Sequence, residues 1–146
     1  MNSKAERRAI ASEADTSTLH ISGIGDEHPL TGAKLAMHPY QVAGVAYAVD
    51  TKRCFIADEM GLGKTLEALA SVQYEDAYPS LVVCPPNLAL NWAKEIEKFF
   101  PTRTWRRVLN RSEFPEEDAD FTIVGYSNID FHPETLKGYR SYIFDE

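Results

Sequence analysis

Short apolar runs alternate with helix-forming segments along most of this chain, and this alternation limits the fold more than any other feature. The expected strands are residues 54–57, 80–84, 103–109, 121–126 and 142–146. Most of these runs are apolar without interruption, which is typical of strands buried on both faces of a parallel sheet. Strands that alternate with helices form crossover units. The sequence therefore predicts an α/β fold with a parallel sheet and a ligand site at the carboxyl ends of its strands.

Three helices are expected beside these strands. The first begins at His38-Pro39, because proline suits the first turn, and its apolar face has the spacing i, i+3, i+4, i+7 in Val42, Val45, Ala46 and Val49. The second spans residues 65–75 and presents on one side Leu66, Leu69, Ala70 and Gln73. The third should be capped by Asn87, through a bond from a backbone N–H, and stopped by Pro101.

Trp92 lies on the third expected helix and has two interpretations. An exposed tryptophan could stack on a nucleic acid base. Its helical phase with Leu88, Ile96 and Phe99 instead favours packing in the core.

The length of 146 residues suffices for one domain with a core. We expect residues 35–146 to form it and residues 1–34 to be a leader or flexible extension. No apolar run approaches the roughly 20 residues that span a bilayer, and the start lacks the apolar core of a secretory signal. We therefore expect an intracellular protein with no membrane partner.

Charge and cysteine content exclude some classes. A net charge of -7 argues against a generally basic nucleic-acid coat. One basic cluster, which charge alone assigns to a solvated helix end and loop, comprises Lys94, Lys98, Arg103, Arg106, Arg107 and Arg111. Cys54 and Cys84 lie in apolar runs without a CxxC spacing, so we expect two buried reduced thiols and neither a metal site nor a disulfide.

The loop DEMGLGKT, residues 58–65, joins an expected strand to an expected helix, which is the setting of a phosphate-binding loop. Its glycines permit a tight turn with N–H groups aimed inward. The helix start adds partial positive charge, Lys64 a full charge, and Thr65 a hydroxyl for magnesium. The alternative is a glycine turn with a solvated lysine. The residues assigned to nucleotide binding here are Asp58, Gly61, Leu62, Gly63, Lys64 and Thr65.

Two carboxylates end the last expected strand. Asp145 can hold magnesium, directly or through water, together with Thr65. Glu146 can orient and deprotonate an attacking water. Many strands end in acids, but a pair that follows a phosphate loop in a parallel sheet indicates a catalytic site. Lys64, Asp145 and Glu146 are thus the expected catalytic residues.

Five stretches together resemble the Swi/Snf family of helicase-like ATPases, in helicase superfamily two. They are LAMHPYQVAGVAY, FIADEMGLGKTLEALA, SLVVCPPNLALNWAKEIEKFF, FTIVGYSNI and YIFDE. The resemblance covers roughly residues 35–146, and Asp58 in place of the usual first glycine of the loop is also the family's habit. It implies a RecA-like P-loop NTPase lobe that uses ATP and Mg²⁺ and acts on duplex DNA.

The resemblance also implies roles for single residues. Gln41 resembles the glutamine that reads adenine, a task that suits its amide donor and acceptor. Pro86 and Asn87 resemble one element that contacts the DNA backbone, and Tyr126 and Ser127 resemble the next. Such contacts imply little preference for base sequence.

This sequence departs from the family at its end. The family continues past Asp-Glu into a further strand of the sheet and a second RecA-like lobe with arginine fingers. The resemblance therefore predicts a truncated first lobe, with the second lobe as its missing partner and no turnover by this chain alone.

We hypothesise part of a DNA-dependent ATPase that remodels or reanneals duplex DNA. The alternatives are a nucleotide- or DNA-binding module without turnover and a P-loop kinase, which the sequence disfavours because no acceptor site or lid is evident. The location would be cytoplasm or nucleoid in a prokaryote or virus and nucleus in a eukaryote.

Overall fold

The computed structural model describes residue 21 and residues 36–53, 56, 63–110, 119–129 and 133–145. The chain divides into two compact units, Met1–Asp76 and Ala77–Glu146, which are considered separately below. Most of the expected leader and of the expected strand at residues 54–57 lies outside the described residues, so both stay predictions. Within the described part of the chain, no helix is long and apolar enough to cross a bilayer.

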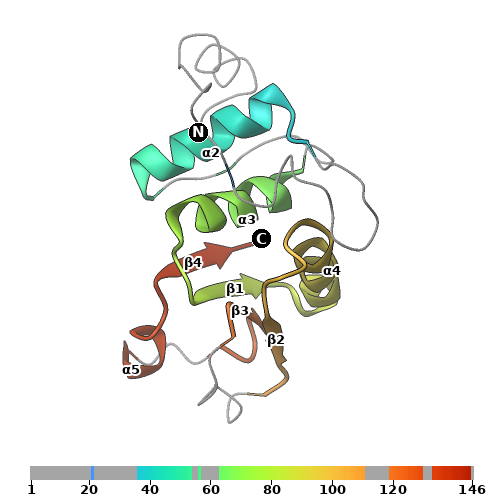
Figure 1. Ribbon diagram of the computed structural model, residues 1–146. Helices are drawn as coiled ribbons and strands as arrows, with labels where there is room; N and C mark the ends of the chain where they lie inside the picture. The colour runs from blue at the N-terminus through green and yellow to red at the C-terminus, as the bar shows by residue number, and fades with distance from the viewer. Residues whose placement is uncertain are drawn as a thin grey trace. The chain divides into compact units, whose positions relative to one another are not determined.

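The first unit contains two helices that pack against each other, α2 (Pro39–Thr51) and α3 (Lys64–Glu75) (Figure 1). Pro39 occupies the first turn of α2, as expected. An ion pair between Lys52 and Glu75, with Nζ and Oε2 2.5 Å apart, joins the ends of the two helices.

The buried side of α2 differs from the expected one. Its buried residues are Gln41, Ala43, Gly44 and Val45, so of the four predicted apolar positions only Val45 is fully buried. The prediction followed the valines, whereas alanine and glycine give no strong apolar signal but let two helix backbones approach closely. In α3 the prediction was better, since Leu66, Leu69 and Ala70 are buried.

The second unit is built on a four-stranded parallel sheet. Its strands are β1 (Ser80–Cys84), β2 (Trp105–Val108), β3 (Phe121–Gly125) and β4 (Ser141–Phe144). They lie in the order β2-β3-β1-β4, and every neighbouring pair is parallel. This confirms the predicted α/β fold, with strands slightly shorter than the apolar runs that predicted them.

The core of the second unit is centred on β1 and β3, whose residues are all buried. One cluster consists of Leu81, Val83, Val108, Val124 and Ile129. β4 is less covered, with Tyr142 44% exposed and Phe144 60% exposed.

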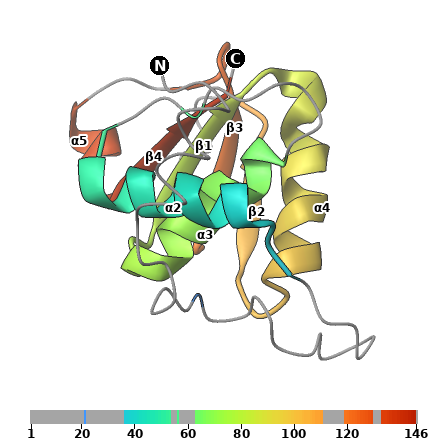
Figure 2. The same ribbon diagram turned by 90° about the horizontal axis from the view of Figure 1, so that it is seen from above.

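Helix α4 (Ala89–Phe99) packs beside β2 and β3 (Figure 2). Trp92, Ile96 and Phe99 are buried, as expected. The prediction that Asn87 caps this helix was wrong, because Leu88 precedes its first turn and no side chain caps it. Asn87 instead lies in a 3-10 turn, η1 (Pro86–Leu88), which the bond from the Leu88 N–H to the Pro85 carbonyl closes at 2.9 Å. A one-turn helix, α5 (Pro133–Leu136), was not expected.

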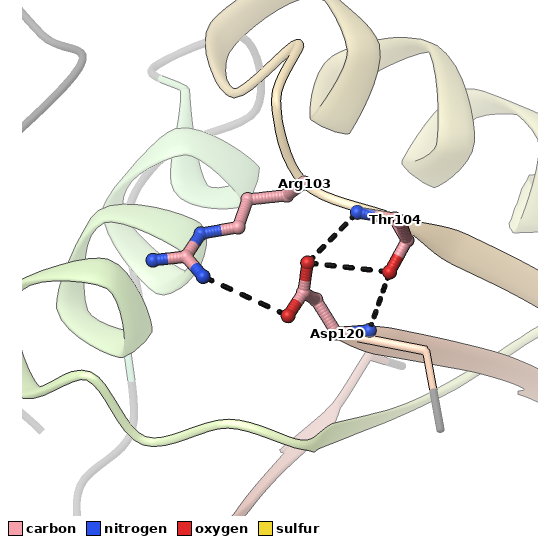
Figure 3. A network of polar contacts seen from close by, with 3 residues as sticks. All are labelled: Arg103, Thr104 and Asp120. Atoms are coloured by element: carbon pink, nitrogen blue, oxygen red, sulfur yellow. Dashed lines mark hydrogen bonds and ion pairs between the residues drawn. The ribbon is translucent and has the colours of Figure 1, made fainter. Parts of the chain in front are cut away.

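A polar network fastens the amino ends of β2 and β3 (Figure 3). Asp120 Oδ2 accepts from the backbone N–H of Thr104 at 2.9 Å and from its hydroxyl at 3.2 Å, and the hydroxyl accepts in turn from the Asp120 N–H at 3.0 Å. Arg103 pairs with Asp120 Oδ1 at 3.6 Å and lies over the Tyr78 ring at 4.1 Å. Arg103 of the basic cluster therefore ties two strand starts together.

Candidate functional site

In the first unit, the described end of the predicted phosphate loop is Gly63-Lys64-Thr65, where α3 begins. Gly63 precedes the helix in a left-handed conformation, with φ 75° and ψ 38°. Its carbonyl accepts the first helical bond, from the Glu67 N–H at 3.2 Å. The N–H groups of Lys64 and Thr65 belong to the first turn, where a helix offers N–H donors to an anion. Asp58, Gly61 and Leu62 lie outside the described residues.

Gln41 lies beside this helix start. A Cβ atom placed on Gly63 would collide with the amide nitrogen of Gln41, so the missing side chain is what lets the two residues touch. Gln41 is 5% exposed, and its Oε1 accepts from the His38 N–H at 2.8 Å. An amide oxygen has two lone pairs and its nitrogen two protons, so this bond and adenine recognition are compatible.

In the second unit, the loops that follow β1, β3 and β4 share the carboxyl edge of the sheet, because the strands are parallel. Gly125, at the end of β3, packs on Pro86, since an added Cβ would lie 3.1 Å from Pro86 Cγ. Arg107 Nη2, from β2, donates to the Pro86 carbonyl at 3.3 Å. The structure thus brings together the two elements that the sequence assigned to DNA contact. Their assigned residues are all exposed and are Pro86, Asn87, Tyr126 and Ser127.

Asp145 directly follows β4 at the same edge and is held at three points. Its N–H donates to the Val83 carbonyl at 2.8 Å. Its own carbonyl accepts from the Tyr126 hydroxyl at 2.5 Å. Its Oδ2 accepts from the indole N–H of Trp92 at 2.9 Å. Glu146 lies outside the described residues.

The bond from Trp92 to Asp145 was missed by the sequence analysis. Trp92 is 4% exposed, which confirms core packing over base stacking. A buried indole N–H nevertheless needs an acceptor, and that rule was the available signal. No spacing could name the acceptor, because it lies 53 residues away in the sequence.

The sequence profile of the SNF2-related domain matches residues 34–129 of this chain. The chain belongs to this family. That confirms the Swi/Snf resemblance, which rested on the five quoted stretches.

Individual relatives agree with this assignment. The SNF2-related chain is 36% identical over 118 residues to the SWI/SNF-related matrix-associated actin-dependent regulator of chromatin subfamily A-like protein 1 homolog of Caenorhabditis elegans, covering 75% of this chain and 17% of that protein. It is 33% identical over 120 residues to the DNA annealing helicase and endonuclease ZRANB3 of Mus musculus, covering 74% and 11%. The chain therefore spans less than a fifth of the length of these curated relatives.

A solved structure shares the fold. The Sulfolobus solfataricus SWI2/SNF2 ATPase core in complex with dsDNA matches with a TM-score of 0.57 and 24% identity, over 85% of this chain and 33% of that one. At this identity the likeness shows the architecture alone, which is the predicted RecA-like one.

Cys84 ends β1 in this SNF2-related domain, and its environment reports the charges at the carboxyl edge. Burial raises the pKa of its thiol to about 11, the negative charge of Asp145 raises it further, and the positive charge of Arg107 lowers it. The thiol is therefore protonated at neutral pH, and it is buried and unpaired with another cysteine, as expected. Cys54 lies outside the described residues.

The predicted magnesium ligands are a hydroxyl, on Thr65, and a carboxylate, on Asp145. Within the described residues no group of three or more His, Cys, Asp or Glu side chains could hold a metal. Magnesium does not need such a cage, because it binds through one or two protein oxygens, waters and substrate phosphates. Trp92 bonds to Oδ2 of Asp145, and no described residue donates to Oδ1. The donor chemistry therefore fits magnesium.

Proposed function

We propose that this SNF2-related domain is the ATP-binding part of a DNA-dependent ATPase that remodels or reanneals duplex DNA. The observation that carries the proposal is the start of α3, where a left-handed Gly63 packs on Gln41 immediately before Lys64 and Thr65. Within this family, that arrangement suits a nucleotide whose phosphates meet a helix start and whose base lies near an amide.

The residues would act on ATP in different ways. The first-turn N–H groups of α3 and the ammonium group of Lys64 would bind the phosphates and compensate their charge. The amide of Gln41 would orient the base, which fixes the phosphates relative to the helix start. Magnesium, when bound, would neutralise phosphate charge, and Thr65 and Asp145 would hold it.

Hydrolysis needs a group that activates water. Glu146 is the proposed one, since its carboxylate can accept the proton of an attacking water. Asp145 is the less suitable candidate, because one of its oxygens already accepts from Trp92.

The DNA part of the proposal rests on exposed residues at one edge of the sheet. Pro86 and Asn87 lie in η1, Tyr126 and Ser127 lie in the turn after β3, and Gly125 packs the two elements together. Arg107 adds a positive charge beside Pro86. We expect contacts to the phosphate backbone, and hence binding that is insensitive to base sequence and weakened by salt.

Steady-state ATP hydrolysis by the full-length protein, with and without duplex DNA, tests the proposal. We expect duplex DNA to stimulate turnover to the order of 1 per second or more, and Glu146→Gln to abolish the stimulation while ATP still binds. ATP binding without any DNA-stimulated turnover would instead support the binding-module alternative.

A further inference from the structure

The carboxyl edge of the second unit contains direct bonds between the proposed DNA-contacting elements and the proposed magnesium-binding carboxylate. Resting on the proposed function, we propose that Trp92 and Tyr126 are positioning residues for Asp145. Through them, duplex DNA bound at Pro86–Asn87 and Tyr126–Ser127 increases the contribution of magnesium to ATP affinity.

Trp92 fixes the carboxylate itself. Its indole has a single N–H donor, and that donor bonds to Asp145 Oδ2 at 2.9 Å. The ring is 4% exposed, so close packing holds the donor in place. Trp92 lies about one turn into α4, and α4 continues directly from η1, which carries Pro86 and Asn87. A phosphate seated on η1 therefore bears on the helix that aims the indole.

Tyr126 fixes the backbone of Asp145. Its hydroxyl donates to the Asp145 carbonyl at 2.5 Å, while the residue itself is 41% exposed at the proposed DNA surface. The same side chain thus stands at the DNA surface and bonds to the magnesium-binding residue. DNA that orders the turn after β3 would also order Asp145.

The two elements move as one because they pack without a gap. An added Cβ on Gly125 would lie only 3.1 Å from Pro86 Cγ. The turn after β3 is closed by the Asn128 N–H, which donates to the Gly125 carbonyl at 3.0 Å. DNA that contacts either element therefore constrains both bonds to Asp145.

Groups that orient a metal ligand strongly affect metal binding. Losing such a partner typically lowers metal affinity by about 10- to 100-fold. Binding linkage also requires reciprocity, so DNA must change the affinity for magnesium-ATP by the same factor by which magnesium-ATP changes the affinity for DNA. The inference can therefore be measured from either ligand.

The first experiment measures the magnesium gain, defined as the ATP dissociation constant in EDTA divided by that in excess magnesium. Calorimetry gives both constants for the full chain, with and without a duplex. We expect duplex DNA to raise the gain in the unmodified chain. Trp92→Phe, which removes the donor and keeps an aromatic ring, should lower the gain about tenfold and remove the DNA effect.

Matched controls exist for both residues. Trp105 also donates its indole N–H to a carboxylate, Glu97 Oε1 at 3.1 Å, so Trp105→Phe removes the same kind of bond away from Asp145. Tyr142 also donates its hydroxyl to a backbone carbonyl, that of Leu136 at 2.5 Å. We expect Tyr126→Phe to reduce the DNA effect on the gain, and neither Trp105→Phe nor Tyr142→Phe to change the gain.

A second measurement keeps Trp92 intact and so does not depend on how its variant folds. The chain has two tryptophans, so in Trp105→Phe the emission reports Trp92 alone. Adding magnesium to the ATP-bound chain should change this emission, because the carboxylate that accepts the indole N–H then shares its charge with the cation. Asp145→Asn in the same background should remove the change.

The outcomes separate this inference from the proposed function. If ATP and duplex DNA both bind, but magnesium leaves Trp92 emission unchanged and the gain is equal with and without Trp92, the positioning role is wrong and the proposed function stands. If the unmodified chain binds no ATP, both are wrong. Tyr126→Phe with an unaltered DNA effect would remove Tyr126 from the coupling.

Discussion

Gly63 shows how one residue can be required for two independent reasons. Its φ of 75° lies in the left-handed region, which is strained by roughly 1–2 kcal/mol for a residue with a Cβ. The same Cβ would also collide with Gln41. The sequence analysis predicted a tight turn here, but the contact with Gln41 only emerged from the structure.

We therefore expect Gly63→Ala to displace Gln41, to lower the free energy of unfolding by about 1–2 kcal/mol and to weaken ATP binding. Gly138 is the matched control, because it has no positive φ and an added Cβ would meet nothing within 4 Å. Chemical denaturation and ATP titration of both variants check this. Equal effects at the two glycines would contradict the assigned geometry.

Gln41 combines a structural bond with its proposed task. The unmodified chain should prefer ATP over GTP, whose base edge reverses donor and acceptor. Gln41→Glu keeps an acceptor for the His38 N–H but loses the amide donor, so it should remove the preference without unfolding α2. Gln41→Ala should remove both the preference and the His38 bond. Competition titrations with the two nucleotides measure this, and equal affinities in the unmodified chain would contradict the assignment.

Cys84 gives a prediction about pH. Its pKa rises from 9.0 to about 11 in the folded chain, so between these values the unfolded chain loses the proton first. The contribution to stability is therefore intact below pH 9 and is lost as the pH rises toward 11. At pH 8 in a Cys54→Ser chain, alkylation of Cys84 should be about a hundredfold slower than that of a peptide thiol. Reaction at the peptide rate would show that the thiol is not buried.

At the scale of elements, the sequence predicted what periodicity encodes and missed what tertiary contacts decide. The strands β1 and β3 and the helices α3 and α4 follow from apolar runs and from phase. The cap at Asn87 was predicted wrongly, because Pro86 begins a 3-10 turn that places Asn87 inside a helical turn and not before it. The buried side of α2 was shifted, because small residues carry no strong apolar signal.

The Asp120 network makes a prediction at this scale. Asp120→Ala removes the acceptor for two bonds from Thr104 and the partner of Arg103, and it should lower the free energy of unfolding by about 1–2 kcal/mol. Glu134→Ala is the matched control, since its pair with Lys137 is 3.9 Å long and about three-quarters exposed and should contribute little. Denaturation curves compare them, and equal losses would mean that the network does not fasten β2 to β3.

At the scale of the whole molecule, the proposed functional residues are divided between two compact units. Gln41, Lys64 and Thr65 belong to the first, and Asp145 with the DNA-contacting residues belongs to the second. The sequence predicted the shared edge of the second unit, because polar loops must follow parallel strands on the same side. The bonds from Trp92 and Tyr126 to Asp145 could not be predicted, since they join distant segments by side-chain geometry alone.

The central claim is that α3 begins at an ATP-binding site, and calorimetric titration of the chain with magnesium-ATP tests it most directly. Lys64→Ala removes the charge that faces the phosphates, whereas Lys137→Ala removes an exposed lysine elsewhere. We predict that Lys64→Ala lowers the affinity at least tenfold, about 1.4 kcal/mol, and that Lys137→Ala leaves it unchanged. Unaltered affinity in a folded Lys64→Ala chain would contradict the claim.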